Sequence, residues 1–77
     1  MDNLLDVKGL LCPLPVLKAR KLLLGMAPGT LLTIEATDPA SVIDIPHFCS
    51  ETGHSLVDQS EADGVYRFVI KRRPENR

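Results

Sequence analysis

The order of apolar patterns in the N-terminal half of the chain constrains the fold more than any other feature of the sequence. Leu4 to Lys8 alternates weakly and stops at Gly9, which predicts a first strand. From Leu14 to Met26, apolar residues recur at helical spacing and predict an amphipathic helix. Thr30 to Ala36 is rich in leucine and β-branched residues, as a central strand is. A strand, a helix and a second strand in this order predict a parallel βαβ unit.

Two starts are open for a second helix. Asp38-Pro39 is typical of a helix start, because an aspartate side chain accepts hydrogen bonds from free backbone N–H groups and proline is tolerated just inside. Pro46 lacks an N–H and disfavours helical geometry at Ile45. Residues 39–45 can therefore form a separate turn instead, with the main helix beginning near Pro46. In both cases Gly53 ends the helix.

The C-terminal part of the chain predicts two more strands. These are His54 to Gln59 and Val65 to Lys71, joined by a loop that contains the hairpin signal Asp63-Gly64. Side chains alternate along the last strand, and the larger set is expected to face the helices; this set is Tyr66, Phe68 and Ile70. The polar end, Arg72 to Arg77, is expected to be frayed.

These elements predict an α+β two-layer sandwich of order βαβαββ. Two helices that share one face of a four-stranded mixed sheet bury their apolar stripes on the same surface. A chain of 77 residues is too short for two cores, so residues 1–77 are expected to form a single domain. A hydrophobic content of 44% suffices for that core and argues against disorder.

Charge and apolar runs exclude several classes of protein. The net charge of −1 lacks the basic excess that carries non-specific nucleic-acid affinity, so no direct nucleic-acid binding is expected. No apolar run approaches the roughly 20 residues of a membrane span. The N-terminus carries no signal-peptide pattern, which favours the cytoplasm. Cys12 and Cys49, 37 positions apart, form no CxxC motif and are expected to be reduced thiols.

Cys12 is the candidate reactive residue. It lies in the segment Gly9-Leu10-Leu11-Cys12-Pro13-Leu14-Pro15, where the first strand gives way to the first helix, and it is expected at or beside the N-cap of that helix. With Cys12 as the N-cap, Pro13 is N1 and Pro15 is N3, two positions whose missing N–H costs the helix nothing. The positive end of the helix dipole and the Leu14 amide then favour the thiolate and are expected to lower the pKa of Cys12. An exposed, rigidly held nucleophile is predicted.

The residues around Cys12 indicate a protein that carries a chemical group on this cysteine, and not a complete enzyme. No second cysteine lies within three residues, and no histidine lies in the same loop to act as a base. The apolar neighbours Leu11 and Leu14 are expected to be exposed and to contact partners. The basic residues of the helix are expected either to be solvated or to steer a negatively charged partner; they are Lys18, Arg20 and Lys21.

The sequence resembles the TusA/SirA-like family of small sulfur carriers, which is marked by a Cys-Pro-x-Pro motif. The motif is Cys12-Pro13-Leu14-Pro15, preceded by Leu5-Asp6 and by Gly9, as in that family. The segments Ala36-Thr37-Asp38-Pro39-Ala40-Ser41 and Asp44-Ile45-Pro46-His47-Phe48-Cys49 also look like TusA. The likeness covers roughly residues 5–72, which is taken as the core of the domain.

The resemblance implies that Cys12 carries sulfane sulfur as a persulfide. The donor is then a cysteine desulfurase or a rhodanese-like protein, and an acceptor protein receives the sulfur for 2-thiouridine formation in tRNA, molybdoenzyme maturation or sulfur oxidation. Gly9, Pro13, Leu14 and Pro15 would support the motif. Such a relay needs no cofactor and no metal, it is a sulfurtransferase only in the sense of a persulfide relay, and a monomer is expected.

The remaining polar and sulfur-bearing residues fit structural roles better than a place in the site. Cys49 shares a helical face with Val42 and Ile45, which favours packing in the core over a role as a resolving thiol or a second sulfur site. His47, Cys49 and His54 lack the spacing of a structural zinc site. Asp38 and Asp44 are most simply explained as helix caps.

Two further functions remain open from the sequence. The first is a redox or regulatory module in which Cys12 forms mixed disulfides with a partner. The second is an RNA-binding module, suggested by RNA-binding sandwiches of similar architecture and by the basic run Lys71-Arg72-Arg73. The low net charge and the scarcity of aromatic residues argue against RNA; the three aromatics are Phe48, Tyr66 and Phe68.

Overall fold

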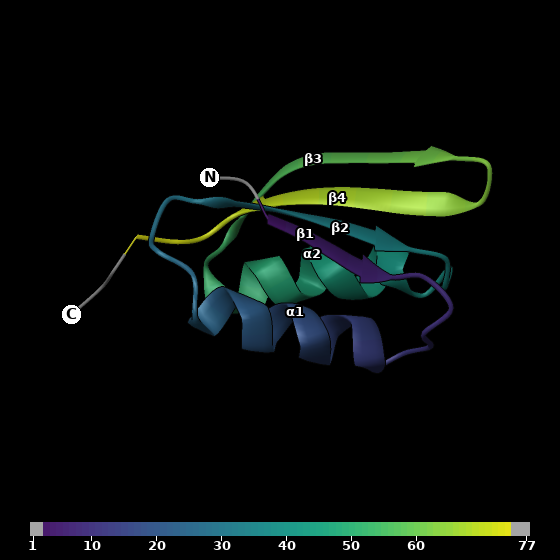
Figure 1. Ribbon diagram of the computed structural model, residues 1–77, viewed down its shortest axis with the longest axis horizontal. Helices are drawn as coiled ribbons and strands as arrows, with labels where there is room; N and C mark the ends of the chain where they lie inside the picture. The colour runs from purple at the N-terminus through teal and green to yellow at the C-terminus, as the bar shows by residue number, and fades with distance from the viewer. Residues whose placement is uncertain (1–2, 75–77) are drawn as a thin grey trace.

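The structure, a computed structural model, describes residues 3–74 and has the predicted order of elements (Figure 1). The elements are β1 (Asn3–Val7), α1 (Leu14–Leu24), β2 (Leu31–Ala36), α2 (Ser41–Thr52), β3 (Ser55–Ala62) and β4 (Val65–Lys71). Both helices lie against the same face of the sheet (Figure 1). The predicted α+β sandwich is therefore confirmed.

The four strands form one mixed sheet in the order β1-β2-β4-β3. β1 and β2 pair in parallel, with Leu5 opposite Ile34, whereas β4 pairs antiparallel with both β2 and β3. The predicted βαβ unit is thus confirmed. Because β1 and β2 run in the same direction, the loops that follow them, and the helix starts that these loops lead into, lie at one end of the molecule (Figure 1).

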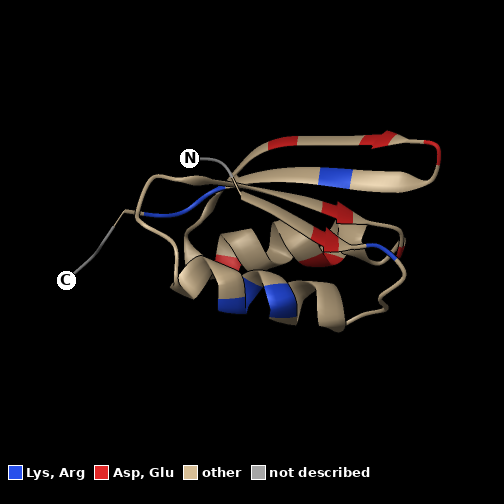
Figure 2. Ribbon diagram, viewed as in Figure 1, with Lys and Arg blue, Asp and Glu red and all other residues tan. Residues whose placement is uncertain are grey.

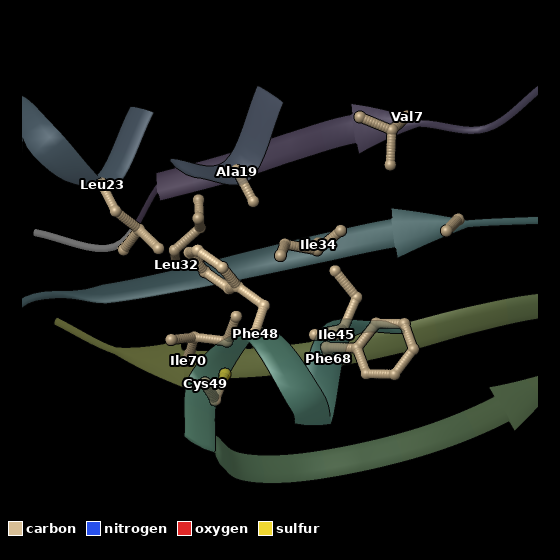
Figure 3. Packing of buried hydrophobic residues seen from close by; sticks show 11 residues of the cluster. Val7, Ala19, Leu23, Leu32, Ile34, Ile45, Phe48, Cys49, Phe68 and Ile70 are labelled. Atoms are coloured by element: carbon tan, nitrogen blue, oxygen red, sulfur yellow. The ribbon is translucent and has the colours of Figure 1, made fainter. Parts of the chain in front are cut away.

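The core lies between the sheet and the two helices (Figure 3). Phe68 and Ile70 of β4 are fully buried and Tyr66 is partly buried, which confirms the face predicted for this strand. Cys49 is buried among these side chains, as predicted. Val42 was expected on the same helical face, but it lies in the first turn of α2 and its exposed fraction is 38%.

The limits of α1 differ from the prediction. The helix ends at Leu24 and not at Met26, because Gly25 caps it by donating its N–H to Leu22 O (3.1 Å). Arg72 closes this end of the helix, since its Nε donates to Leu23 O (3.0 Å). The backbone N–H of Arg72 donates to Thr30 O (2.8 Å), so the expectation of a frayed end is wrong at this residue. Residues 75–77 of that segment lie outside the described part of the chain.

α2 is one continuous helix through Pro46. It starts at Ser41, with Ala40 at the N-cap, so the alternative of a main helix beginning near Pro46 is wrong. Pro46 removes only the hydrogen bond to the carbonyl of Val42, and Val42 is exposed enough for water to replace the missing donor. Neither α1 nor α2 is long and apolar enough to cross a membrane, as judged over residues 3–74.

The β3–β4 hairpin is longer than predicted. β3 extends to Ala62, three residues beyond Gln59, and leaves only Asp63 and Gly64 as the loop. Both residues have positive φ (53° and 79°), as the turn type favoured by an Asp-Gly pair requires. The register of the pair shifts between Leu56 and Asp58. The predicted turn is confirmed. The strand before it continues up to the turn, although the polar sequence of β3 suggested an earlier end.

Gly53 ends α2 in the left-handed conformation (φ 86°) and offers a test of the predicted helix end. The Gly53→Ala variant is expected to lose about 1–2 kcal/mol of unfolding free energy, because a side chain disfavours this conformation. A Cβ there would make ordinary contact with the Arg73 side chain (3.7 Å), so crowding adds little. Gly25→Ala is the control, since Gly25 has φ −94°. Equal losses in urea unfolding for the two variants would contradict the explanation.

Candidate functional site at the start of α1

Cys12 lies on the exposed loop between β1 and α1, and its thiol is free. The loop begins with a turn in which the Leu10 N–H donates to Val7 O (3.1 Å). Pro15, three residues beyond Cys12, is buried and anchors the start of α1. The predicted exposure of Cys12 agrees with the structure.

The loop that follows β2 holds the Cys12 loop in place. The Gly9 N–H donates to Thr37 Oγ1 (2.9 Å), and the Cys12 N–H donates to Asp38 Oδ2 (2.7 Å). The other carboxylate oxygen of Asp38 accepts the N–H of Ala40 (3.2 Å). Asp38 therefore ties the backbone of Cys12 to the start of α2, a long-range role beyond the capping predicted for it.

The start of α1 lies one residue later than the sequence suggested. Pro13 is the N-cap, Leu14 is N1 and Pro15 is N2, and the Cys12–Pro13 peptide bond is cis. The Leu14 N–H was expected to remain free for the sulfur, but it donates to Leu11 O (2.9 Å). Cys12 therefore lies beside the N-cap and not at it, and the amide predicted to stabilise a thiolate is already occupied.

A groove between α1 and α2, which we call the sulfur groove, opens beside Cys12 and has a volume of about 310 Å³. Val16, Leu17 and Arg20 of α1 form one wall. The other wall comes from α2, and its residues are Asp44, His47, Phe48, Glu51 and Thr52. Figure 2 shows basic positions on α1 and acidic positions on α2. The groove thus combines an apolar lining with charges of both signs.

Carboxylates dominate the electrostatics of Cys12. A hydrogen bond with the Asp44 carboxylate raises the pKa of the Cys12 thiol above its ordinary value, and desolvation and the charges of Asp44 and Asp38 act in the same direction. The predicted lowering of this pKa is therefore wrong. The physical reason is that two carboxylates face the position where the helix dipole alone would have favoured a thiolate.

The structure separates the residues that were expected to contact partners. Leu11 and Leu14 are exposed near the sulfur, with exposed fractions of 69% and 43%. Arg20 lines the sulfur groove. Lys18 and Lys21 instead line a different groove, formed by the other side of α1 and the start of β1. Only part of the basic face of α1 therefore lies beside Cys12.

Cys49 and His54 do not line the sulfur groove, whereas His47 lies on its α2 wall. Burial raises the pKa of Cys49 to about 11, which leaves an inert thiol. His47 lies 3.6 Å from a Glu51 carboxylate oxygen, whereas His54 packs against Phe48 and accepts the Arg73 N–H (3.0 Å). Among residues 3–74, no group of three or more His, Cys, Asp or Glu side chains is arranged to hold a metal ion.

Three residues that position or charge the site were missed as site residues. Thr37 and Asp38 follow β2 as Cys12 follows β1, and parallel strands bring such segments to the same edge of a sheet. The predicted βαβ unit therefore contained the signal for these two. The sequence predicts Asp44 as a cap, but α2 has no side-chain cap hydrogen bond, and Asp44 lines the groove from its first turn.

Comparisons with known proteins agree with this geometry. The family model described as Sulfurtransferase TusA matches residues 3–72. Sulfur carrier protein TusA of Allochromatium vinosum is 45% identical over 71 residues, covering 92% of this chain and 93% of the relative. Sulfur carrier protein TusA of Pseudomonas aeruginosa is 43% identical over 75 residues, covering 97% of this chain and 95% of the relative.

A solved structure gives the same result for the fold. The crystal structure of a SirA-like protein from Desulfitobacterium hafniense superposes with a TM-score of 0.79 at 28% identity, covering 92% of this chain and 97% of that one. The family model alone spans nearly the whole chain, and it includes the Cys12 loop and both walls of the sulfur groove. The chain therefore belongs to the sulfurtransferase TusA family.

Proposed function

We propose that this protein is a sulfur carrier that holds sulfane sulfur as a persulfide on Cys12. The observation that carries the proposal is the exposed thiol of Cys12, which lines the sulfur groove and whose backbone N–H is held by Asp38. Membership of the TusA family and the names of its relatives, sulfur carrier proteins, support the same function. Cys49, the other sulfhydryl, is buried and serves packing.

The chemistry needs one nucleophilic sulfur and no cofactor. The Cys12 sulfur attacks the terminal sulfur of a donor persulfide, a new S–S bond forms at Cys12, and the S–S bond of the donor breaks. The cysteine sulfur of the donor leaves as a thiolate and takes up the proton that Cys12 released. No net oxidation occurs. An acceptor thiolate then attacks the terminal sulfur on Cys12 and restores the thiol. Exposure of Cys12 allows both encounters.

This chemistry requires two kinds of partner protein, a sulfur donor and a sulfur acceptor. The donor is a cysteine desulfurase or a rhodanese-like protein, and the acceptor is a protein cysteine in a cytoplasmic sulfur pathway, such as the one that forms 2-thiouridine in tRNA. Exposed leucines beside Cys12 fit these contacts; they are Leu11, Leu14 and Leu17. Phe48 and Phe68 are buried and Tyr66 is partly buried, which removes the stacking surface that an RNA-binding role requires.

Loading of the purified protein tests the proposal. After incubation with a cysteine desulfurase and L-cysteine, the intact mass is expected to rise by one sulfur atom and to return to its starting value after a reductant is added. Incubation without L-cysteine is the control. A mass that never rises would contradict sulfur carriage. Disulfide-linked complexes formed under oxidising conditions without any desulfurase would favour the redox module instead.

A further inference from the structure

The charges around Cys12 disfavour its nucleophilic form, the thiolate, in the free protein. Asp38 approaches it from the β2–α2 loop, and its carboxylate accepts the Cys12 N–H at 2.7 Å. Asp44 approaches from the first turn of α2 and lines the same groove as Cys12. Two negative charges beside one sulfur make a second negative form, the thiolate, unfavourable.

The remaining charged groups of the sulfur groove leave this arrangement in place. Glu51 and His47 lie further along α2 and face each other at 3.6 Å. Arg20, on α1, is the one cationic side chain that lines the groove within residues 3–74 and is not a histidine. The raised pKa of Cys12 has Asp44 and Asp38 among its causes and no opposing cation. Arg20 therefore does not offset the carboxylates at the sulfur.

We propose that Asp44 and Asp38 form an electrostatic gate, which lowers the thiolate fraction of Cys12 in the free carrier and favours partners that bring a positively charged side chain into the sulfur groove. This inference rests on the proposed function and adds a partner chemistry to it. An arginine or lysine next to the donor persulfide pairs with the carboxylates, removes their effect on the sulfur, and lets Cys12 ionise where the sulfur is to be transferred. The proton released by Cys12 passes to the leaving thiolate of the donor.

The gate also explains a selectivity that a carrier needs. A permanently ionised, exposed thiolate reacts with oxidants and with any disulfide in the cell, because thiolates are the reactive form of cysteine. A thiol that ionises only beside a cationic partner reacts mainly within the correct complex. Exposure and low intrinsic reactivity are then compatible at the same residue, because Cys12 is exposed while the two carboxylates raise the pKa of its thiol.

The first test measures the thiol without any partner. The rate of Cys12 alkylation by iodoacetamide is followed against pH for the wild type, Asp44→Asn and Asp58→Asn. Asp44→Asn is expected to shift the profile to lower pH and to react several-fold faster at neutral pH, because one of the opposing charges is gone. Asp58→Asn is the matched control, since Asp58 lies exposed on β3 and does not line the sulfur groove. Overlapping profiles for wild type and Asp44→Asn would overturn the gate.

The second test uses small disulfides of different charge as stand-ins for partners. Thiol–disulfide exchange at Cys12 is measured with cystamine, which is cationic, and with 3,3′-dithiodipropionate, which is anionic. The ratio of the two rates is expected to be roughly tenfold higher in the wild type than in Asp44→Asn at low salt, and the difference is expected to shrink as salt is added. An equal ratio in both proteins would overturn the choice of a cationic partner.

Neither test measures sulfur transfer, so the gate and the proposed function can be contradicted independently of each other. If the desulfurase loads the protein while the alkylation profiles overlap, the carrier function stands and the gate is wrong. If the profiles differ as expected but no sulfur is gained, the gate on the thiol stands and the function proposed for it is wrong. Circular dichroism of Asp44→Asn checks that the variant is folded before either result is interpreted.

Discussion

The Cys12→Ala variant is expected to gain no sulfur at all when it is incubated with a cysteine desulfurase and L-cysteine. The chain has only two cysteines, and the other one, Cys49, is 97% buried in the core with a pKa of about 11. A buried neutral thiol neither reaches a donor persulfide nor attacks it. The intact mass of Cys12→Ala is therefore expected to stay unchanged under conditions that load the wild type.

Cys49→Ala is the matched control for that experiment. This variant keeps the Cys12 loop and is expected to load sulfur as the wild type does, although the smaller side chain leaves a gap in the core and lowers stability. A mass gain that survives Cys12→Ala, or one that disappears in a folded Cys49→Ala protein, would contradict the assignment of the sulfur to Cys12.

Phe68→Ala is expected to have the largest effect on stability. Phe68 lies in the middle of β4, is fully buried between the sheet and α2, and has the largest fully buried side chain in the described part of the chain. Its loss is expected to cost about 3–5 kcal/mol. The free energy of unfolding of a domain of this length is roughly 4–12 kcal/mol, so the variant loses a large share of it. Urea unfolding followed by far-ultraviolet circular dichroism measures the change.

Val57→Ala is the control for Phe68→Ala. Val57 also lies in a strand, but 54% of it is exposed, and it lies where the β3–β4 register shifts. Its replacement is expected to change the unfolding free energy by no more than about 0.5 kcal/mol. If Phe68→Ala unfolds at the same urea concentration as Val57→Ala, the core does not depend on Phe68 as the packing indicates.

The order and pairing of the elements could be predicted because local patterns determine them. The alternation in β4 placed Phe68 and Ile70 on the buried face, and the Asp63-Gly64 pair marked the hairpin turn. The ends of elements were less predictable, since tertiary contacts decide them. α2 continues through Pro46, although a proline removes a hydrogen bond and disfavours a helix interior, because burial of Ile45 and Phe48 on the same helix offsets that cost.

The candidate site was predictable at Cys12 and not in its electrostatics. A thiol at a helix start, seen alone, predicts a lowered pKa. The groups that reverse this lie 26 and 32 positions further along the chain, at Asp38 and Asp44, and only the parallel pairing of β1 and β2 brings the first of them to the Cys12 backbone. A prediction from the helix start alone omits the two carboxylates that raise the pKa of Cys12.

Mapping the loaded sulfur tests the central claim most directly. After loading, the persulfide is capped with iodoacetamide and the protein is digested with trypsin, which separates Cys12, in residues 9–18, from Cys49, in residues 22–67. Mass spectrometry is expected to find the capped persulfide on the peptide with Cys12 and only a thiol on the other. A persulfide on the Cys49 peptide, with Cys12 carrying none, would contradict the account.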